Sequence, residues 1–144
     1  MSFLAIDLPV SALDLEITVG AFGVPAGFPS PADDDLEDEI NLLEWMVPHP
    51  GATFLFRIDG WCLKDLGIMD RDVVAVDRAG TARNGRAVMA IVDGQRMAKV
   101  IRKSRGRVWL ETANAAMGHQ VVPMSGTVEI FGVIAGVVRR YPVE

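Results

Sequence analysis

The chain has 144 residues, half of them hydrophobic, and carries a formal net charge of −5 at neutral pH. This length supports one globular core and leaves little chain for a second domain. A single cysteine excludes an intramolecular disulfide and a multi-cysteine zinc site, and His49 and His119 are far apart in sequence. We therefore expect no metal ion and no cofactor.

No segment of the sequence has the pattern of a membrane span or a secretion signal. The longest apolar runs, such as residues 132–138, are much shorter than the roughly 20 residues that cross a bilayer. No basic segment precedes an early hydrophobic stretch. We therefore expect a cytoplasmic protein without a membrane partner.

The charges divide the chain into two unlike parts. Residues 1–56 hold ten acidic residues and no lysine or arginine, whereas residues 57–144 hold all 14 basic residues against nine acidic ones. Phosphate repels a segment so acidic, which argues against sequence-specific DNA binding by the N-terminal part. A basic cluster is the one candidate nucleic-acid surface, and a solvated hairpin is its simpler explanation: Arg96, Lys99, Arg102, Lys103, Arg105 and Arg107.

The N-terminal residues are expected to form an arm. Residues 1–18 mix apolar and acidic positions and predict short extended or helical pieces that need a partner to pack on. Residues 20–31 contain three glycines and three prolines, which disfavour both a helix and a central strand. We expect a flexible arm and linker over residues 1–31 and a folded domain over residues 32–144.

One short helix is expected at the start of the domain. The acidic run 33–35 precedes apolar residues at helical spacing, Leu36, Ile40, Leu43 and Val47, and negative charge is favourable at a helix N-terminus. Pro48 ends the predicted helix.

Beyond it the pattern is that of strands. They are expected at residues 53–58, 73–77, 87–92, 95–102, 107–112 and 127–140. Asp93-Gly94 predicts a two-residue hairpin between two of them. Gly126, Gly132 and Gly136 predict bulges or bends in the last stretch. Short strands without long intervening helices indicate a mainly β domain of mostly antiparallel strands.

Lys99 is placed unusually within its predicted strand. Alternation puts it on one face with the apolar side chains of Met97 and Ile101. If that face is the core, burial disfavours the ammonium form, and a neutral amine can serve as a general base. The other interpretation is an edge-strand lysine whose stem covers apolar surface while its charge reaches water.

Cys62 follows a predicted strand directly, after Asp59-Gly60-Trp61. A tight turn at this place could present the thiol to a bound peptide. A lone cysteine is otherwise a small buried hydrophobe. No histidine lies in a thiol-activating motif, so a cysteine–histidine protease has little support.

A resemblance to a known family covers about residues 22–141. The chain resembles UmuD, the mutagenesis accessory branch of the self-cleaving LexA/UmuD family, first in its segment 26–32 and then, without gaps, along the domain. The matching residues are Ala26 to Ala32, His49-Pro50, Ala52-Thr53, Gly60, Asp65, Gly67-Ile68, Asp72, Val76-Asp77, Val92-Asp93-Gly94, Lys99 and Phe131-Gly132-Val133.

The resemblance implies a LexA/UmuD C-terminal-type fold with a serine–lysine dyad that cuts the protein's own arm. The scissile bond corresponds to Ala26–Gly27, the base to Lys99, and the nucleophile to Cys62, where the family has serine. It also implies a homodimer, a RecA filament on single-stranded DNA as activator, and a Y-family, UmuC-like polymerase as partner in SOS mutagenesis and translesion synthesis.

Three functions stay open at this point. The first is a self-processing accessory factor, and the second is a non-cleaving interaction module of the same fold that binds a polymerase or a RecA filament. The third is a general peptidase that acts on other proteins through the same dyad. A LexA-type repressor is disfavoured, because some 25 acidic, turn-rich residues cannot form a DNA-binding helix-turn-helix.

Overall fold

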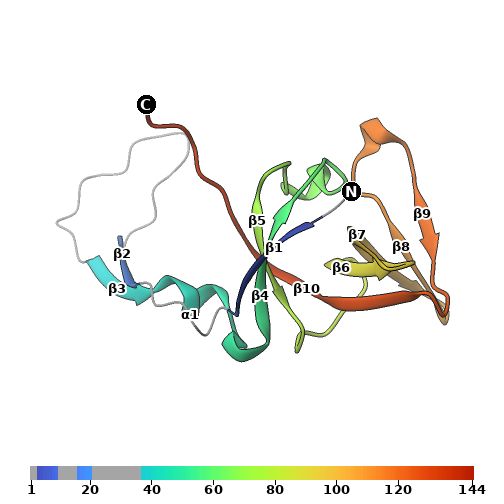
Figure 1. Ribbon diagram of the computed structural model, residues 1–144, viewed down its shortest axis with the longest axis horizontal. Coiled ribbons are helices and arrows are strands. Elements are labelled where there is room, and N and C mark those ends of the chain that lie inside the picture. Colours follow the sequence, from blue (N-terminus) through green and yellow to red (C-terminus); the bar gives the residue numbers. More distant parts are fainter. Residues whose placement is uncertain (1–2, 10–15, 21–36) are drawn as a thin grey trace.

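The computed structural model describes residues 3–9, 16–20 and 37–144 of the chain (Figure 1). Short 3-10 turns at residues 50–52, 64–66 and 115–117 connect some of its elements. The helix and strands are β1 (Phe3–Pro9), β2 (Glu16–Gly20), β3 (Glu37–Asn41), α1 (Leu42–Met46), β4 (Thr53–Ile58), β5 (Val73–Asp77), β6 (Ala87–Val92), β7 (Gln95–Ser104), β8 (Arg107–Glu111), β9 (Val121–Pro123) and β10 (Val128–Val138).

Eight of these strands form one antiparallel sheet in the order β1-β4-β5-β10-β6-β7-β8-β9. The long strand β10 pairs with β5 on one side and β6 on the other, so it joins the two halves of the sheet. Figure 1 shows β2 and β3 at one end of the molecule and β8 and β9 at the other. The predicted mainly β fold is confirmed.

Two glycines allow β10 to bend. The register of β10 shifts next to Gly132 and again next to Gly136, as a bulge requires. A Cβ at Gly132 would lie 2.8 Å from the carbonyl oxygen of Asp77, and one at Gly136 would lie 2.5 Å from Met46 Cγ. Any larger residue at either position would therefore force the neighbouring chain to move.

Positive backbone angles close the two hairpins around β7. Asp93 and Gly94 have φ values of 49° and 80°, and Arg105 and Gly106 have φ values of 50° and 78°. Two consecutive positive φ values match the right-handed twist of the flanking strands. The predicted Asp93-Gly94 hairpin is thus present, and Arg105-Gly106 forms a second one.

Strand β7 lies inside the sheet, between β6 and β8. Its middle residues contribute to two core clusters, Ala98 and Val100 to one and Ile101 to the other. Because successive side chains point to opposite faces, apolar residues cover both faces of this strand at its centre. The edge-strand interpretation of Lys99 is therefore wrong.

The predicted helix is correct only in its second half. Residues 42–46 form α1, but residues 37–41 form β3, which pairs with β2. A short isolated helix is marginal in water, and a partner strand offers these residues a full set of backbone hydrogen bonds instead. Among the described residues, every helix is too short to span a bilayer.

Two segments of the expected arm are strands. Strand β1 pairs with β4 at the edge of the large sheet, and β2 pairs with β3. The partners that residues 1–18 were expected to need are therefore β4 for strand β1 and β3 for strand β2. The predicted cleavage point, Ala26–Gly27, lies outside the described residues, in the connection between β2 and β3.

Candidate active site

Cys62 lies in the loop that follows β4. Its preceding turn contains Gly60 with φ of 104°, a value that L-residues with side chains rarely adopt. The Gly60 N–H donates a hydrogen bond of 2.6 Å to Asp70 Oδ1. This glycine lets the chain reverse sharply after the strand and places Cys62 and Leu63 inside, where they are 6% and 1% exposed.

The Cys62 loop is fixed to the segment that follows β8. The Asn114 side-chain amide donates to the Trp61 carbonyl, and the Ala113 N–H donates to the Cys62 carbonyl, both at 2.8 Å. In return, the N–H of Asp65 donates to the Ala113 carbonyl at 2.8 Å. Backbone hydrogen bonds from both sides therefore hold the cysteine in one position relative to β8.

Lys99 comes from the middle of β7 and is 6% exposed. Its partner across the β6 ladder is Val88, which is fully buried. In the part of the chain that the structure describes, no carboxylate oxygen pairs with its amine. Burying an ammonium without a counter-charge is costly, so this is an unusual place for a lysine with a purely structural role.

The structure brings the two predicted residues together. Lys99 Nζ lies 3.6 Å from Cys62 Sγ, although 37 residues separate them in sequence. The amine also donates a hydrogen bond of 3.1 Å to Thr112 Oγ1, just beyond the end of β8. The sulfur, the amine and the hydroxyl thus form one buried, contiguous group from three separate segments.

Sequence reasoning did not identify Thr112 or Asn114 as site residues. Thr112 is 8% exposed and Asn114 is 5% exposed, and both have hydrogen-bond partners in the site. Buried polar side chains are informative, but Thr112-Ala113-Asn114 has no motif that predicts this position. Both residues also line a surface hollow of about 470 Å³ that contains Asp65 and His119.

This geometry suits proton transfer from sulfur to nitrogen. An amine in contact with a thiol can accept its proton and leave a thiolate, the nucleophilic form of cysteine. The described residues contain no group of three or more metal-ligating side chains placed to hold an ion.

Two ion pairs hold the neighbouring segments. Arg139 Nε donates to Asp72 Oδ1 at 2.7 Å, and this hydrogen bond lowers the pKa of Asp72 despite the opposing effect of burial. At Glu111 burial raises the pKa, but hydrogen bonds from Arg102 and Trp109 outweigh it and leave the pKa below its usual value. Both carboxylates are therefore held in the charged form near neutral pH.

The family model described as Peptidase S24-like matches residues 19–135. The chain belongs to this family. The matched region includes Ala26–Gly27, Cys62 and Lys99.

Individual relatives agree with the family match. Protein MucA of Salmonella typhimurium is 36% identical over 121 residues, which cover 83% of this chain and 82% of MucA. Protein ImpA of Escherichia coli is 34% identical over 115 residues, or 80% and 78% of the two chains. LexA repressor 1 of Pseudomonas syringae pv. tomato is 33% identical over 118 residues, covering 81% of this chain and 58% of the repressor.

Proposed function

We propose that this protein is a self-processing accessory factor of SOS mutagenesis and translesion DNA synthesis. It cleaves its own chain between Ala26 and Gly27, with Cys62 as nucleophile and Lys99 as general base. The observation that carries this proposal is the 3.6 Å contact between the buried amine and the thiol, in a member of the Peptidase S24-like family.

The chemistry proceeds in two stages. The neutral amine of Lys99 takes the thiol proton, and the thiolate of Cys62 attacks the Ala26 carbonyl carbon. The ammonium of Lys99 then returns the proton to the Gly27 nitrogen, and the C–N bond breaks to leave a thioester. Water, deprotonated by Lys99, cleaves the thioester and regenerates the thiol. The products are residues 1–26 with a new carboxylate and residues 27–144 with a new amine.

The sequence around the bond suits entry into a narrow site. Ala26 and Gly27 are small, and the prolines on either side favour an extended backbone. Strands β2 and β3 pair at the two ends of the 16-residue connection that contains the bond.

The strand pairings also bear on what cleavage releases. Both β1 and β2 precede the scissile bond, and they pair with β4 and β3, which follow it. After the cut, residues 1–26 would be joined to the rest of the protein by non-covalent contacts, which include the ladders of β1 with β4 and of β2 with β3. We expect this fragment to stay bound under native conditions and to separate in denaturant.

The partners in this proposal come from the resemblance to UmuD. They are a second copy of the chain in a homodimer, a RecA filament on single-stranded DNA as activator, and a Y-family, UmuC-like polymerase. The relation to MucA, ImpA and LexA repressors supports this assignment. The folded domain over residues 32–144 would carry both the dyad and these contacts.

Incubation of the purified chain at mildly alkaline pH, with and without activated RecA, tests the proposal. We expect denaturing mass spectrometry to show fragments 1–26 and 27–144, whose masses together exceed the intact mass by one water. Cys62→Ser tests whether a hydroxyl can replace the thiol. Cys62→Ala should give no cleavage, and Lys64→Ala, which removes an exposed lysine near the same loop, should cleave normally.

An intact mass in every condition would instead support the non-cleaving interaction module. Binding of the intact chain to RecA filaments or to the polymerase would then be measured directly. Cleavage that persists in Cys62→Ala would remove Cys62 from the mechanism. Cleavage at another bond would move the scissile position without changing the dyad.

A further inference from the structure

A second hollow lies at the opposite end of the β7–β8 hairpin from Lys99. It has a volume of about 570 Å³ and is lined by Ser104, Arg105, Arg107, Trp109 and Val121; we call it the Trp109 hollow. None of these residues is Cys62, Lys99 or Thr112, and Ser104 lies five positions from Lys99 along β7, roughly 16 Å in a strand. The hollow is thus separate from the contact between Cys62 and Lys99.

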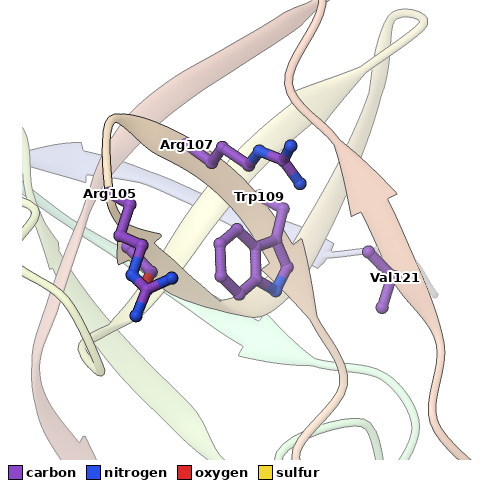
Figure 2. A pocket seen from close by; sticks show the side chains of 5 residues that line it. Arg105, Arg107, Trp109 and Val121 are labelled. Carbon is purple, nitrogen blue, oxygen red and sulfur yellow. The ribbon is translucent and has the colours of Figure 1, made fainter.

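The sheet builds a flat aromatic platform in this hollow. Arg107, Trp109 and Glu111 alternate along β8 and share one face, while Leu110 points into the core on the other. Trp109 Nε1 donates to Glu111 Oε2 at 3.1 Å, which holds the ring at its edge. Figure 2 shows the ring next to Arg105 and Arg107, with Val121 of β9 beyond it.

Both arginines of the hollow are available to an anion. Arg105 and Arg107 are exposed, and neither takes part in an ion pair within the described part of the chain. Glu111, two residues along β8 from Trp109, is paired with Arg102 at 2.5 Å. Ser104 and Arg107 are opposite each other in the β7–β8 ladder, as are Arg102 and Trp109, so these side chains share one face. The guanidinium group stays charged at any physiological pH and matches the geometry of phosphate oxygens.

We propose that the Trp109 hollow binds single-stranded nucleic acid without sequence preference. Trp109 stacks against a base, and Arg105 and Arg107 contact the phosphates on either side of it. Trp109 is half-buried at the wall of the hollow. Aromatic rings on which bases stack, beside positive charge, are a general means by which proteins bind unpaired strands. Neither side chain reads a base edge, so this inference agrees with the absence of sequence-specific binding expected from the acidic N-terminal part.

The acidic segment of the chain itself is a competing occupant, since residues 33–39 contain six carboxylates. The described part of that segment, β3, lies at the far end of the molecule from β8 and β9 (Figure 1). Moreover, a carboxylate-rich peptide needs only the cations, whereas the ring of Trp109 forms part of the wall of the hollow. These observations favour a ligand that has both a phosphate and a flat base.

Fluorescence anisotropy of a labelled oligothymidylate with the full-length chain tests this inference. The chain is acidic overall, so we expect weak binding, with a dissociation constant on the order of 10⁻⁶ to 10⁻⁴ M. Arg105→Ala combined with Arg107→Ala should lower the slope of log affinity against log salt by about 1.4, since each phosphate contact on a single strand contributes about 0.7. Trp109→Leu should weaken binding roughly 5- to 100-fold, and Trp109→Phe should retain most of it.

A charge-matched control separates a local site from general attraction. Lys64→Ala combined with Arg140→Ala removes two exposed cations elsewhere and should leave the salt slope unchanged. Cys62→Ala should bind like the parent chain, because the inference does not depend on cleavage. Equal losses in the two double variants, or no binding at low salt, would overturn the proposal. Tighter binding of a synthetic peptide of residues 30–44 than of the oligonucleotide would also overturn the proposal. If Trp109→Leu does not fold, the arginine variants alone test the proposal.

Discussion

The β7–β8 hairpin carries cations at both of its ends, and their surroundings are opposite. At the inner end Lys99 is 6% exposed and contacts a thiol and a hydroxyl. At the outer end Arg105 and Arg107 are exposed beside Trp109 and an open hollow. The same hairpin thus places Lys99 where water is excluded and Arg105 and Arg107 where it is not.

Burial of the side chain therefore determines which role a cation on this hairpin can have. A buried amine is held near the groups with which it can exchange a proton, which is what a general base requires. An exposed guanidinium keeps its charge and its hydration, so it contributes to binding and not to proton transfer. The sequence already differs at the two ends, since apolar residues flank Lys99 whereas Ser104 and Gly106 flank Arg105.

The largest effect is expected at the inner end. Lys99→Ala removes the base and should slow cleavage by about 10²- to 10⁴-fold, the usual contribution of general-base catalysis. Mass spectrometry of the incubated chain measures this. Oligonucleotide binding should not change, and cleavage at the normal rate in this variant would remove Lys99 from the mechanism.

A buried residue between the two ends of the hairpin should contribute to the stability of both. Leu110 is fully buried and lies in the core cluster under β8. We expect Leu110→Ala to lower the free energy of unfolding by about 2 to 5 kcal/mol, as is usual for loss of a buried leucine side chain. Denaturant unfolding measures the change, and a loss below 1 kcal/mol would contradict the packing described for β8.

Thr112 should have a smaller effect, confined to the inner end. Its hydroxyl accepts the hydrogen bond from Lys99, so Thr112→Val should slow cleavage roughly 5- to 30-fold, the usual value of one hydrogen bond. Thr112→Ser keeps the hydroxyl and should restore most of the rate. If Thr112→Ser cleaves as slowly as Thr112→Val, the hydroxyl by itself does not account for the effect of Thr112.

The smallest effect is expected at the outer end and depends on pH. The pKa of Glu111 lies below its usual 4.5, so its hydrogen bond to Trp109 is present above that value and is lost as the pH falls through the lower folded-state pKa. Fluorescence of Trp109, measured with Trp45 and Trp61 replaced by phenylalanine, should report a transition below pH 4.5. Glu111→Gln should abolish it; persistence there would assign it to another group.

Local patterns were sufficient for most of the domain. Alternating apolar residues between turn signals predicted β4 to β8 and β10 to within a few residues, because strand periodicity and turn geometry are short-range properties. The short strand β9 had too few residues to give a pattern. The sequence predicts a helix over strand β3, because the apolar residues there have helical spacing. The segment is extended instead because it pairs with β2.

The amino-acid sequence was enough to predict the family, the mainly β fold, and Cys62 and Lys99 as the candidate nucleophile and base. The contact between them, the place of Thr112 beside Lys99, and the hollow that Trp109 shares with two arginines that form no ion pair among the described residues all depend on the tertiary structure. The physical reason is that these contacts join segments far apart in the chain, whose positions depend on the order of strands in the whole sheet. No residue pattern within one segment determines that order.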